Sequence, residues 1–139
     1  MNLGHDITVL TGYPNYPKGE IFKEFKKNKK KFDKYKGIQI VRVPIFPRKN
    51  NKLTLSINYL SFLFNSIIFG YFKLRKRNFD IVFTCQLSPV TVGITSAFFS
   101  YINKCPNVLW VLDLWPHTLV ALNIIKKVWQ INLLNLLVN

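Results

Sequence analysis

Four short, mostly apolar segments of strand length divide the chain, and they constrain its fold more than any other feature. They cover residues 6–12, 37–46, 79–86 and 107–115. Three of them are near-continuous apolar runs, which are typical of strands that are buried on both faces of a parallel sheet. Helix-length segments separate the second strand from the third and the third from the fourth. The alternation predicts an α/β fold with a doubly wound parallel sheet.

At 139 residues the chain has the length of one domain. Both of its ends nevertheless have the pattern of internal sequence. Leu3 and Gly4 resemble the C-terminal end of a helix, and residues 118–139 are helical in pattern but stop without a capping residue. We therefore expect residues 1–139 to be one part of a larger protein.

Residues 53–72 contain twenty residues without a charge, and basic residues flank them on both sides. This length and composition would allow a transmembrane helix. Four polar residues follow a helical spacing, however, and form a single stripe: Thr54, Asn58, Ser61 and Asn65. A lipid-spanning helix does not need such a stripe, whereas a helix that packs on a sheet or lies in a membrane interface does. The sequence favours packing on the sheet and leaves interfacial contact and a true span as alternatives.

The chain is strongly basic, with a formal net charge of +14. Residues 18–36 hold nine lysines against three acidic residues, and residues 73–77 hold four basic residues and no acidic one. Clusters of this kind favour an anionic partner, a class that includes phospholipid, nucleic acid and phosphorylated substrates. For residues 26–36, a solvated lysine-rich loop is an equally good interpretation.

The sequence contains no recognisable metal or nucleotide motif. Cys85 and Cys105 lack metal-ligand spacing and are expected to be reduced thiols in a cytosolic compartment. Glycine-rich phosphate loops and the nucleophile motif of α/β hydrolases are absent. The N-terminus also lacks the pattern of a secretory signal. We therefore expect no metal and no cofactor in this chain.

Polar residues follow three of the four predicted strands, in residues 11–19, 84–89 and 113–118. In an open α/β sheet, ligands bind beyond the carboxyl ends of the strands. In the first cluster, two prolines hold the tyrosines before them in extended conformations, so this stiff loop either packs on the core or lines a cleft. We expect the three clusters to meet at one edge of the sheet. Their candidate site residues are Tyr13, Asn15, Tyr16, Gln86, Ser88, Asp113, Trp115 and His117.

Asp113 and His117 are the carboxylate and the imidazole of this set. His117 could accept a proton from an acceptor hydroxyl, and Asp113 could orient the imidazole or act as the base itself. In the alternative interpretation, Asp113 caps the following helix and His117 is a first-turn residue near solvent. The sequence favours this alternative for His117 and leaves both interpretations of Asp113 open.

Five stretches of the sequence carry a resemblance to a known family. They read GHDITVLTGYPNYPKGEIF, GIQIVRVPIFPRKNN, NYLSF, DIVFTCQLSPVTVG and LWVLDLWPHTLVAL, in this order. In order and spacing they resemble the N-terminal domain of bacterial GT-B glycosyltransferases of family 4. The greatest likeness is to the fucosaminyltransferase-like and colanic-acid-type enzymes of O-antigen and capsule synthesis. The resemblance covers nearly the whole chain and implies a Rossmann-like doubly wound fold, incomplete here as the N-terminal domain of a GT-B enzyme.

The resemblance implies a retaining transferase of surface polysaccharide synthesis. Such an enzyme moves a sugar from a nucleotide-sugar donor to a polyprenyl-diphosphate-linked saccharide acceptor at the cytoplasmic face of the cell membrane. The N-terminal domain would hold the acceptor and touch the anionic membrane surface as a peripheral protein, and a C-terminal domain would hold the donor. Tyr13 and Tyr16 would then shape the acceptor cleft.

The chain departs from the family pattern in several places. The family's first strand, glycine-rich loop and first helix should precede Met1, and the C-terminal donor-binding domain is absent. Leu112 stands where many relatives have His or Gln, and His117 stands where several have Glu. Without a donor domain, the positioning and electrostatic contributions to catalysis are lost. The isolated chain is therefore predicted to be inactive, and a separately encoded C-terminal half is a candidate partner.

Two other function classes account for parts of the sequence. A nucleic-acid-binding module would place its lysines on phosphates and stack bases on its tyrosines. The lysines gather in one loop and no recognition motif is present, so no nucleic-acid partner is expected. The alternative that stays open is a small, basic, membrane-associated interaction protein built on residues 53–72.

Overall fold

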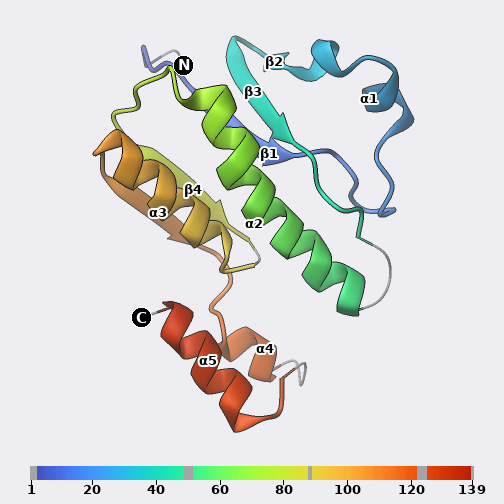
Figure 1. The fold of residues 1–139 in the computed structure, drawn as a ribbon, viewed down its shortest axis with the longest axis vertical. Coiled ribbons are helices and arrows are strands. Elements are labelled where there is room, and N and C mark those ends of the chain that lie inside the picture. The colour runs from blue at the N-terminus through green and yellow to red at the C-terminus, as the bar shows by residue number, and fades with distance from the viewer. Residues whose placement is uncertain (1–2, 49–51, 88, 122–124, 139) are drawn as a thin grey trace. The chain divides into compact units, whose positions relative to one another are not determined.

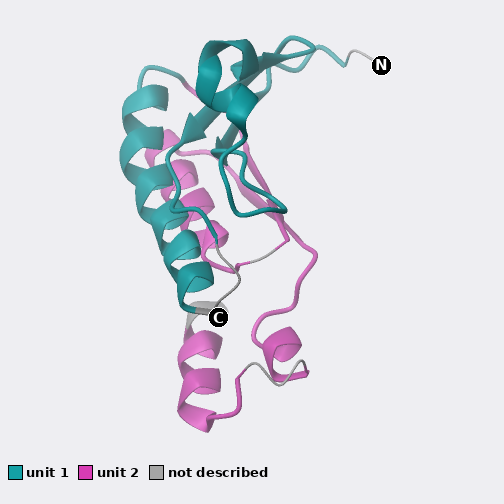
Figure 2. Ribbon diagram, turned by 90° about the vertical axis from the view of Figure 1, so that its right-hand side faces the viewer, with its two compact units in different colours: residues 1–77 teal, residues 78–139 magenta. Residues whose placement is uncertain are grey.

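The computed structural model describes residues 3–48, 52–87, 89–121 and 125–138. The chain divides into two compact units, residues 1–77 and residues 78–139 (Figure 2). Each unit contains a small sheet and a long helix that packs on its strands, as labelled in Figure 1.

The first unit is built on a three-stranded sheet with the strand order β1-β3-β2. Strand β1 (Thr8–Gly12) runs parallel to β3 (Ile38–Val43), in a register that pairs Thr8 with Gln39. Strand β2 (Lys34–Tyr35) is antiparallel to the beginning of β3. Val, Ile and Thr make up much of β1 and β3, and such β-branched residues suit the pleated backbone of a strand.

A two-residue turn joins β2 to β3. Lys36 and Gly37 both have positive φ angles, 47° and 86°, as the central residues of a type I′ hairpin turn require. Upstream of β2, the chain forms the short helix α1 (Lys23–Lys27) and the 3-10 helix η1 (Lys29–Phe32). Helix α1 contributes the buried side chain of Phe25, which anchors this otherwise lysine-rich segment to the core.

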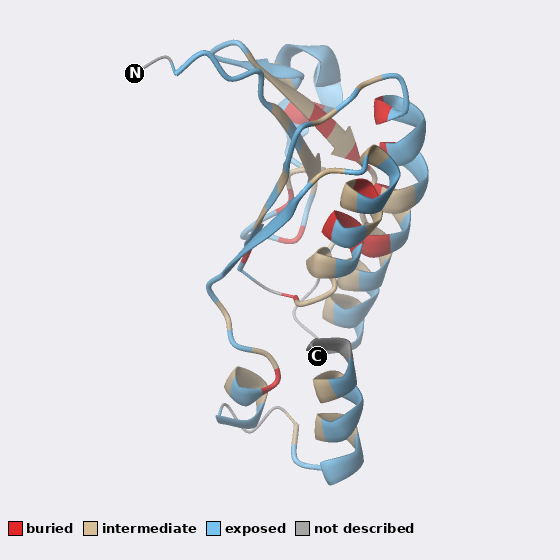
Figure 3. Ribbon diagram, turned by 90° about the vertical axis from the view of Figure 1, so that its left-hand side faces the viewer, coloured by how far each residue is buried: buried red, intermediate tan, exposed pale blue. Residues whose placement is uncertain are grey.

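Helix α2 (Lys52–Leu74) packs on β1 and β3. The buried apolar residues of the first unit are Phe25, Val41, Val43, Leu63 and Leu74. Figure 3 shows that buried positions, drawn in red, are few and that exposed positions predominate. The core is therefore small, and much of the apolar surface of the chain faces outward.

The second unit contains a parallel pair of strands, β4 (Val82–Gln86) and β5 (Asn107–Val111), in which Thr84 pairs with Leu109. Helix α3 (Val92–Asn103) connects the two strands and packs on both of them. All five residues of β5 are exposed. Helix α3 therefore covers this strand pair only in part.

Two further helices follow in the second unit, α4 (His117–Ala121) and α5 (Val128–Val138). Residues 125–127 are not helical. The helical stretch that the sequence pattern predicts for residues 118–139 is thus divided into two helices.

The predicted α/β class is confirmed, since each predicted strand segment contains a strand and the two intervening helical segments form α2 and α3. The strands are shorter than predicted. Strand β3 ends where Pro44 follows it, because proline has no N–H to continue the ladder. The strands also pair as two sheets, where the sequence predicts one doubly wound sheet. The doubly wound arrangement therefore stays a prediction.

Candidate functional site

A cluster of polar groups lies where β4 and β5 end. Gln86 is the last residue of β4, and its side chain is 2 % exposed. Its Nε2 donates a hydrogen bond to the main-chain oxygen of Asp113 at 3.0 Å. Its main-chain oxygen accepts a hydrogen bond from the N–H of Leu112, also at 3.0 Å. Gln86 thereby ties the segment that follows β5 to the end of β4.

Asp113 and Trp115 interact within this segment. The indole Nε1 of Trp115 donates a hydrogen bond to Oδ2 of Asp113 at 2.9 Å, and both side chains are half-buried. The carboxylate thus binds the Trp115 side chain, and its capping and catalytic interpretations both stay open. The indole thus holds one oxygen of the carboxylate in place.

His117 is the first residue of α4, and its side chain is exposed. This position is that of a first-turn residue near solvent, as the alternative interpretation expects. Catalytic roles for His117 and for Asp113 stay predictions.

The tyrosine loop, residues 13–19, follows β1 in the first unit. Tyr13 extends the strand ladder, because its N–H donates to the main-chain oxygen of Val43 at 3.1 Å. Its ring packs on Phe25, with 5.0 Å between the ring centroids. Tyr16 is 69 % exposed, and the guanidinium carbon of Arg48 lies 5.7 Å from its ring centroid. Tyr13 therefore packs on the core, whereas Tyr16 is presented at the surface.

Asn15 is buried in the same loop, with 8 % of its surface exposed. Its main-chain oxygen accepts a hydrogen bond from Gly19 at 2.8 Å and closes the loop. Its side-chain Nδ2 is buried and has no hydrogen-bond partner among the described residues. Buried polar groups are generally paired with protein or water, so a ligand or a water molecule is needed to satisfy this donor.

The candidate residues from the sequence fall into two groups. The group in the second unit consists of Gln86, Asp113, Trp115 and His117, of which the first three are linked by hydrogen bonds. The group in the first unit consists of Tyr13, Asn15 and Tyr16, which share one loop. Ser88 lies outside the described residues. Convergence of the two groups at one edge stays a prediction.

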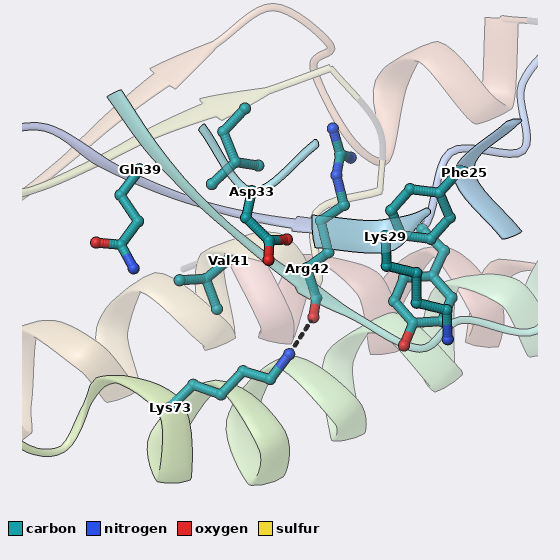
Figure 4. Close-up of a pocket in the computed structure, with 9 residues that line it drawn as sticks. Phe25, Lys29, Asp33, Gln39, Val41, Arg42 and Lys73 are labelled. Carbon is teal, nitrogen blue, oxygen red and sulfur yellow. Dashed lines mark hydrogen bonds between the residues drawn. The ribbon is translucent and has the colours of Figure 1, made fainter. Parts of the chain in front are cut away.

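A cavity of about 360 Å³ lies beside β3 in the first unit (Figure 4). Its charged lining residues are Lys29, Asp33, Arg42 and Lys73. Lys73 reaches from α2 and donates a hydrogen bond from Nζ to the main-chain oxygen of Arg42 at 2.7 Å. Nζ of Lys29 lies 4.9 Å from the ring centroid of Tyr13, which also lines the cavity. Three cations against one carboxylate give the lining a preference for anionic ligands.

The Arg42 guanidinium contacts a main-chain oxygen and an aromatic ring of the first unit. Its Nη1 donates to the main-chain oxygen of Gly12 at 3.3 Å, and its guanidinium carbon lies 5.5 Å from the ring centroid of Phe25. Its Nε is buried without a hydrogen-bond partner among the described residues. Sequence reasoning missed Lys29, Arg42 and Lys73 as lining residues. The basic clusters of residues 18–36 and 73–77 include Lys29 and Lys73, but a charge cluster does not identify which of its members line a site.

Three members of the polar stripe of α2 bind the segment that follows β3. Nδ2 of Asn65 donates to the main-chain oxygen of Pro44 at 2.8 Å. Oγ of Ser61 accepts from the N–H of Phe46 at 2.8 Å, and Nδ2 of Asn58 donates to the main-chain oxygen of Phe46. The stripe thus contacts protein backbone. The predicted packing of this helix on the sheet is confirmed by the contacts of α2 with β1 and β3.

Another side of α2 is apolar and exposed. Six of its exposed apolar residues recur with helical spacing and are named here the outer stripe: Leu53, Ile57, Leu60, Phe64, Ile68 and Tyr71. By length and composition, residues 53–74 would be able to cross a membrane, a property that core helices of soluble proteins share. Only 11 % of the apolar stretch is buried, however, which is low for a core helix.

Among the described residues, no group of three or more His, Cys, Asp or Glu side chains is placed to hold a metal ion. In comparison with known proteins, no family model matches the chain, and no curated protein or solved structure matches it either. Function is therefore inferred from the geometry and the sequence motifs alone.

Proposed function

We propose that the chain forms the acceptor-side domain of a glycosyltransferase, which moves a sugar from a nucleotide-sugar donor to a polyprenyl-diphosphate-linked saccharide. The observation that carries this proposal is the cluster of Gln86, Asp113 and Trp115 at the carboxyl ends of β4 and β5. Parallel α/β sheets bind their ligands at this end of the strands. The cluster also lies within two of the stretches that resemble family 4 enzymes, FTCQLSP and LDLWPHT.

The cluster offers the groups that recognition of a saccharide requires. Trp115 contributes an aromatic surface with a polar edge, which suits a ligand that is apolar on one face and polar on the other. Its indole N–H holds one oxygen of Asp113, and the second oxygen would accept a hydrogen bond from an acceptor hydroxyl. In this proposal Asp113 orients or deprotonates the hydroxyl that attacks the donor sugar.

We further propose that the two parallel strand pairs belong to one Rossmann-like, doubly wound arrangement. Two observations support this: β1 and β3 are parallel, as are β4 and β5, and a long helix follows each of β3 and β4. A second domain, on the same chain or separately encoded, would bind the nucleotide-sugar donor. The 139-residue chain is then predicted to bind the acceptor without transferring a sugar.

A second candidate function is that of a small, basic, membrane-associated interaction protein. The outer stripe of α2 favours it, because exposed apolar side chains that lie together along one side of a helix are typical of an interaction surface. This candidate needs no saccharide site, so it assigns no binding role to Trp115.

Binding of a soluble acceptor separates the two functions. A short-chain polyprenyl-diphosphate-linked monosaccharide is titrated into the chain and followed by calorimetry. The expected result is saturable binding that Trp115→Ala weakens about tenfold, the order of effect of a lost aromatic contact. The control variant is Trp129→Ala, which removes an exposed tryptophan from α5 and is expected to bind like the parent chain.

Weaker binding by Trp115→Ala than by Trp129→Ala supports the acceptor site. Equal binding by the two variants, or the absence of saturable binding by the parent chain, contradicts the acceptor-side function and favours the interaction protein.

A further inference from the structure

The cavity beside β3 runs along an edge of this strand. Successive side chains of a strand point to opposite faces of its sheet, so a cavity under one face would meet only alternate residues. This cavity is lined by four consecutive residues of β3, which are Gln39, Ile40, Val41 and Arg42. It therefore lies at the edge of the strand, where Lys73 of α2 and Lys29 of η1 also reach it (Figure 4).

This edge of β3 is paired only over its first half. Strand β2 is two residues long and pairs with Ile38 and Gln39. The N–H of Ile40 still donates to the main-chain oxygen of Asp33, at 2.8 Å. The N–H of Asp33, however, donates to the oxygen of Lys30 in η1, at 3.2 Å, so the chain turns away from β3 at this point. In the described part of the first unit, the ladder on this edge therefore ends at Ile40, before the end of β3.

Arg42 directs its main-chain N–H and C=O to the open part of this edge. The odd-numbered residues of β3 bond to the segment of β1, as the N–H of Gln39 and the oxygen of Val43 do. Main-chain groups of successive strand residues point to opposite edges, so those of Arg42 face away from β1. Nζ of Lys73 agrees with this direction, because it donates to the Arg42 oxygen at 2.7 Å. A lysine side chain thus occupies part of the place of a neighbouring strand.

Charge selects what can bind at this edge. Lys73 reaches it from α2, and Nζ of Lys29 lies 4.9 Å from the ring centroid of Tyr13 in the same cavity. Lysines at a strand edge hinder pairing with other strands in general, whereas they favour a strand that carries carboxylates. Residues 18–36, which include η1, hold nine lysines against three acidic residues. A second copy of this basic chain would be repelled.

We propose that the open edge of β3 binds an acidic, extended segment of a partner protein, which adds a strand beside residues 41–43. In this mode of recognition, main-chain hydrogen bonds give affinity and side-chain contacts give specificity. Arg42 supplies the main-chain groups. Lys73 exchanges the Arg42 oxygen for a carboxylate of the segment, and Lys29 binds a second carboxylate. The inference uses the first unit alone and goes beyond both functions proposed above.

A peptide segment suits this edge better than a small anion does. A volume of about 360 Å³ is at the small end of ligand sites, so the cavity admits a short extended segment and not a folded domain. A small anion would pair chiefly with the cations. A peptide also offers the N–H and C=O groups that an open strand edge requires.

Three fluorescent hexapeptides test the proposal by anisotropy at constant ionic strength. The first alternates glutamate with valine and should bind the chain. The second has lysine in place of each glutamate and should not bind. The third is the acidic peptide with N-methyl groups on its two central residues, which keep the charge but remove hydrogen-bond donors. It should bind at least about tenfold more weakly, because strand addition needs those donors whereas attraction between charges does not.

Substitution of lysines tests where the peptide binds. Lys29→Gln and Lys73→Gln should each weaken binding of the acidic peptide about fivefold, the upper range for an ion pair near a protein surface. The control variants are Lys26→Gln in α1 and Lys76→Gln after α2, which remove exposed lysines that do not line the cavity. They should bind like the parent chain. All four variants lose the same charge, so the comparison isolates the position of the lysine.

Amide hydrogen exchange measured by NMR tests how the peptide binds. The N–H of Arg42 should exchange about tenfold more slowly in the complex, because the added strand gives it an acceptor. Amides of α5 should exchange at an unchanged rate.

Several outcomes would each overturn the proposal. They are absence of binding by the acidic peptide, equal affinity for its N-methylated form, equal effects of the lining and control lysines, and unchanged exchange at Arg42. Displacement of the peptide by inorganic phosphate at constant ionic strength would instead indicate a site for small anions. These measurements use no saccharide, so their failure is distinguishable from a failure of acceptor binding.

Discussion

Nε2 of Gln86 and the main-chain oxygen of Asp113 form a hydrogen bond of 3.0 Å, although 27 positions separate the two residues in the sequence. The bond forms because β4 and β5 are parallel neighbours, so their carboxyl ends lie at the same edge. Gln86 is almost completely buried. We therefore expect it to position the segment that presents Asp113 and Trp115 rather than to contact an acceptor itself, which refines its predicted role in substrate binding.

Replacement of this glutamine should destabilise the second unit. Gln86→Leu removes the donor and leaves a main-chain oxygen without its partner, at a cost of about 1–3 kcal/mol in the free energy of unfolding. Urea unfolding followed by tryptophan fluorescence measures the effect, since all three tryptophans lie in residues 78–139. Gln130→Leu in α5 is the control and should change the free energy by less than about 0.5 kcal/mol. Equal effects of the two variants would argue against the positioning role.

Two glycines should respond oppositely to the same substitution. Gly37 has a φ of +86° in the turn between β2 and β3, so Gly37→Ala should cost about 1–2 kcal/mol in stability. Gly93 lies in α3, where an added β-carbon would meet only Leu109, at an ordinary contact distance of 3.9 Å. Gly93→Ala should therefore stabilise the chain by about 0.5 kcal/mol. Thermal unfolding of both variants checks the signs. Stabilisation by Gly37→Ala would contradict the turn geometry, and destabilisation by Gly93→Ala would contradict the room for a β-carbon in α3.

An apolar substitution in the polar stripe should destabilise α2, although it makes the helix more hydrophobic. Asn65→Leu removes the hydrogen bond to the Pro44 oxygen, which should cost about 1 kcal/mol and loosen α2. Hydrogen–deuterium exchange of α2 amides is expected to accelerate. Asn132→Leu, at an exposed position of α5, is the matched control and should leave the exchange of α2 unchanged. Unchanged exchange in Asn65→Leu would show that the stripe does not hold the helix.

The two cysteines should differ in reactivity. Cys85 is exposed on β4, whereas Cys105 is half-buried after α3. Because access to the thiolate controls the rate, a thiol reagent such as DTNB should react faster with Cys85. Cys85→Ser should remove the fast phase, and Cys105→Ser should retain it. The opposite assignment of the two phases would contradict the observed orientation of β4.

Several features of the fold could be predicted from sequence pattern. The apolar segments around β1, β3, β4 and β5 were recognisable because strand residues of a parallel sheet are apolar over several consecutive positions. The uncharged run of residues 53–72 predicted α2. The turn at Lys36 and Gly37 was not predicted, since a lysine at positive φ has no signature in the sequence.

The candidate site was predictable only in outline. The rule that ligands bind beyond the carboxyl ends of parallel strands selected Gln86, Asp113 and Trp115, and the structure links these three by hydrogen bonds. The rule did not predict that Gln86 would be buried or that the Trp115 indole would hold the Asp113 carboxylate. Both depend on how the segment after β5 folds back, which the identities of its residues do not specify.

The order of residues by itself determined the local elements, the concentration of positive charge and the existence of two stripes on α2, one polar and one apolar. Only the tertiary structure decided which neighbour each stripe meets: the polar stripe binds the main chain of residues 44–46, and the outer stripe is left exposed. Helical periodicity sets the angle between two stripes on one helix. The rotation of that helix against its neighbours is set by hydrogen bonds and packing that form only when distant segments come together.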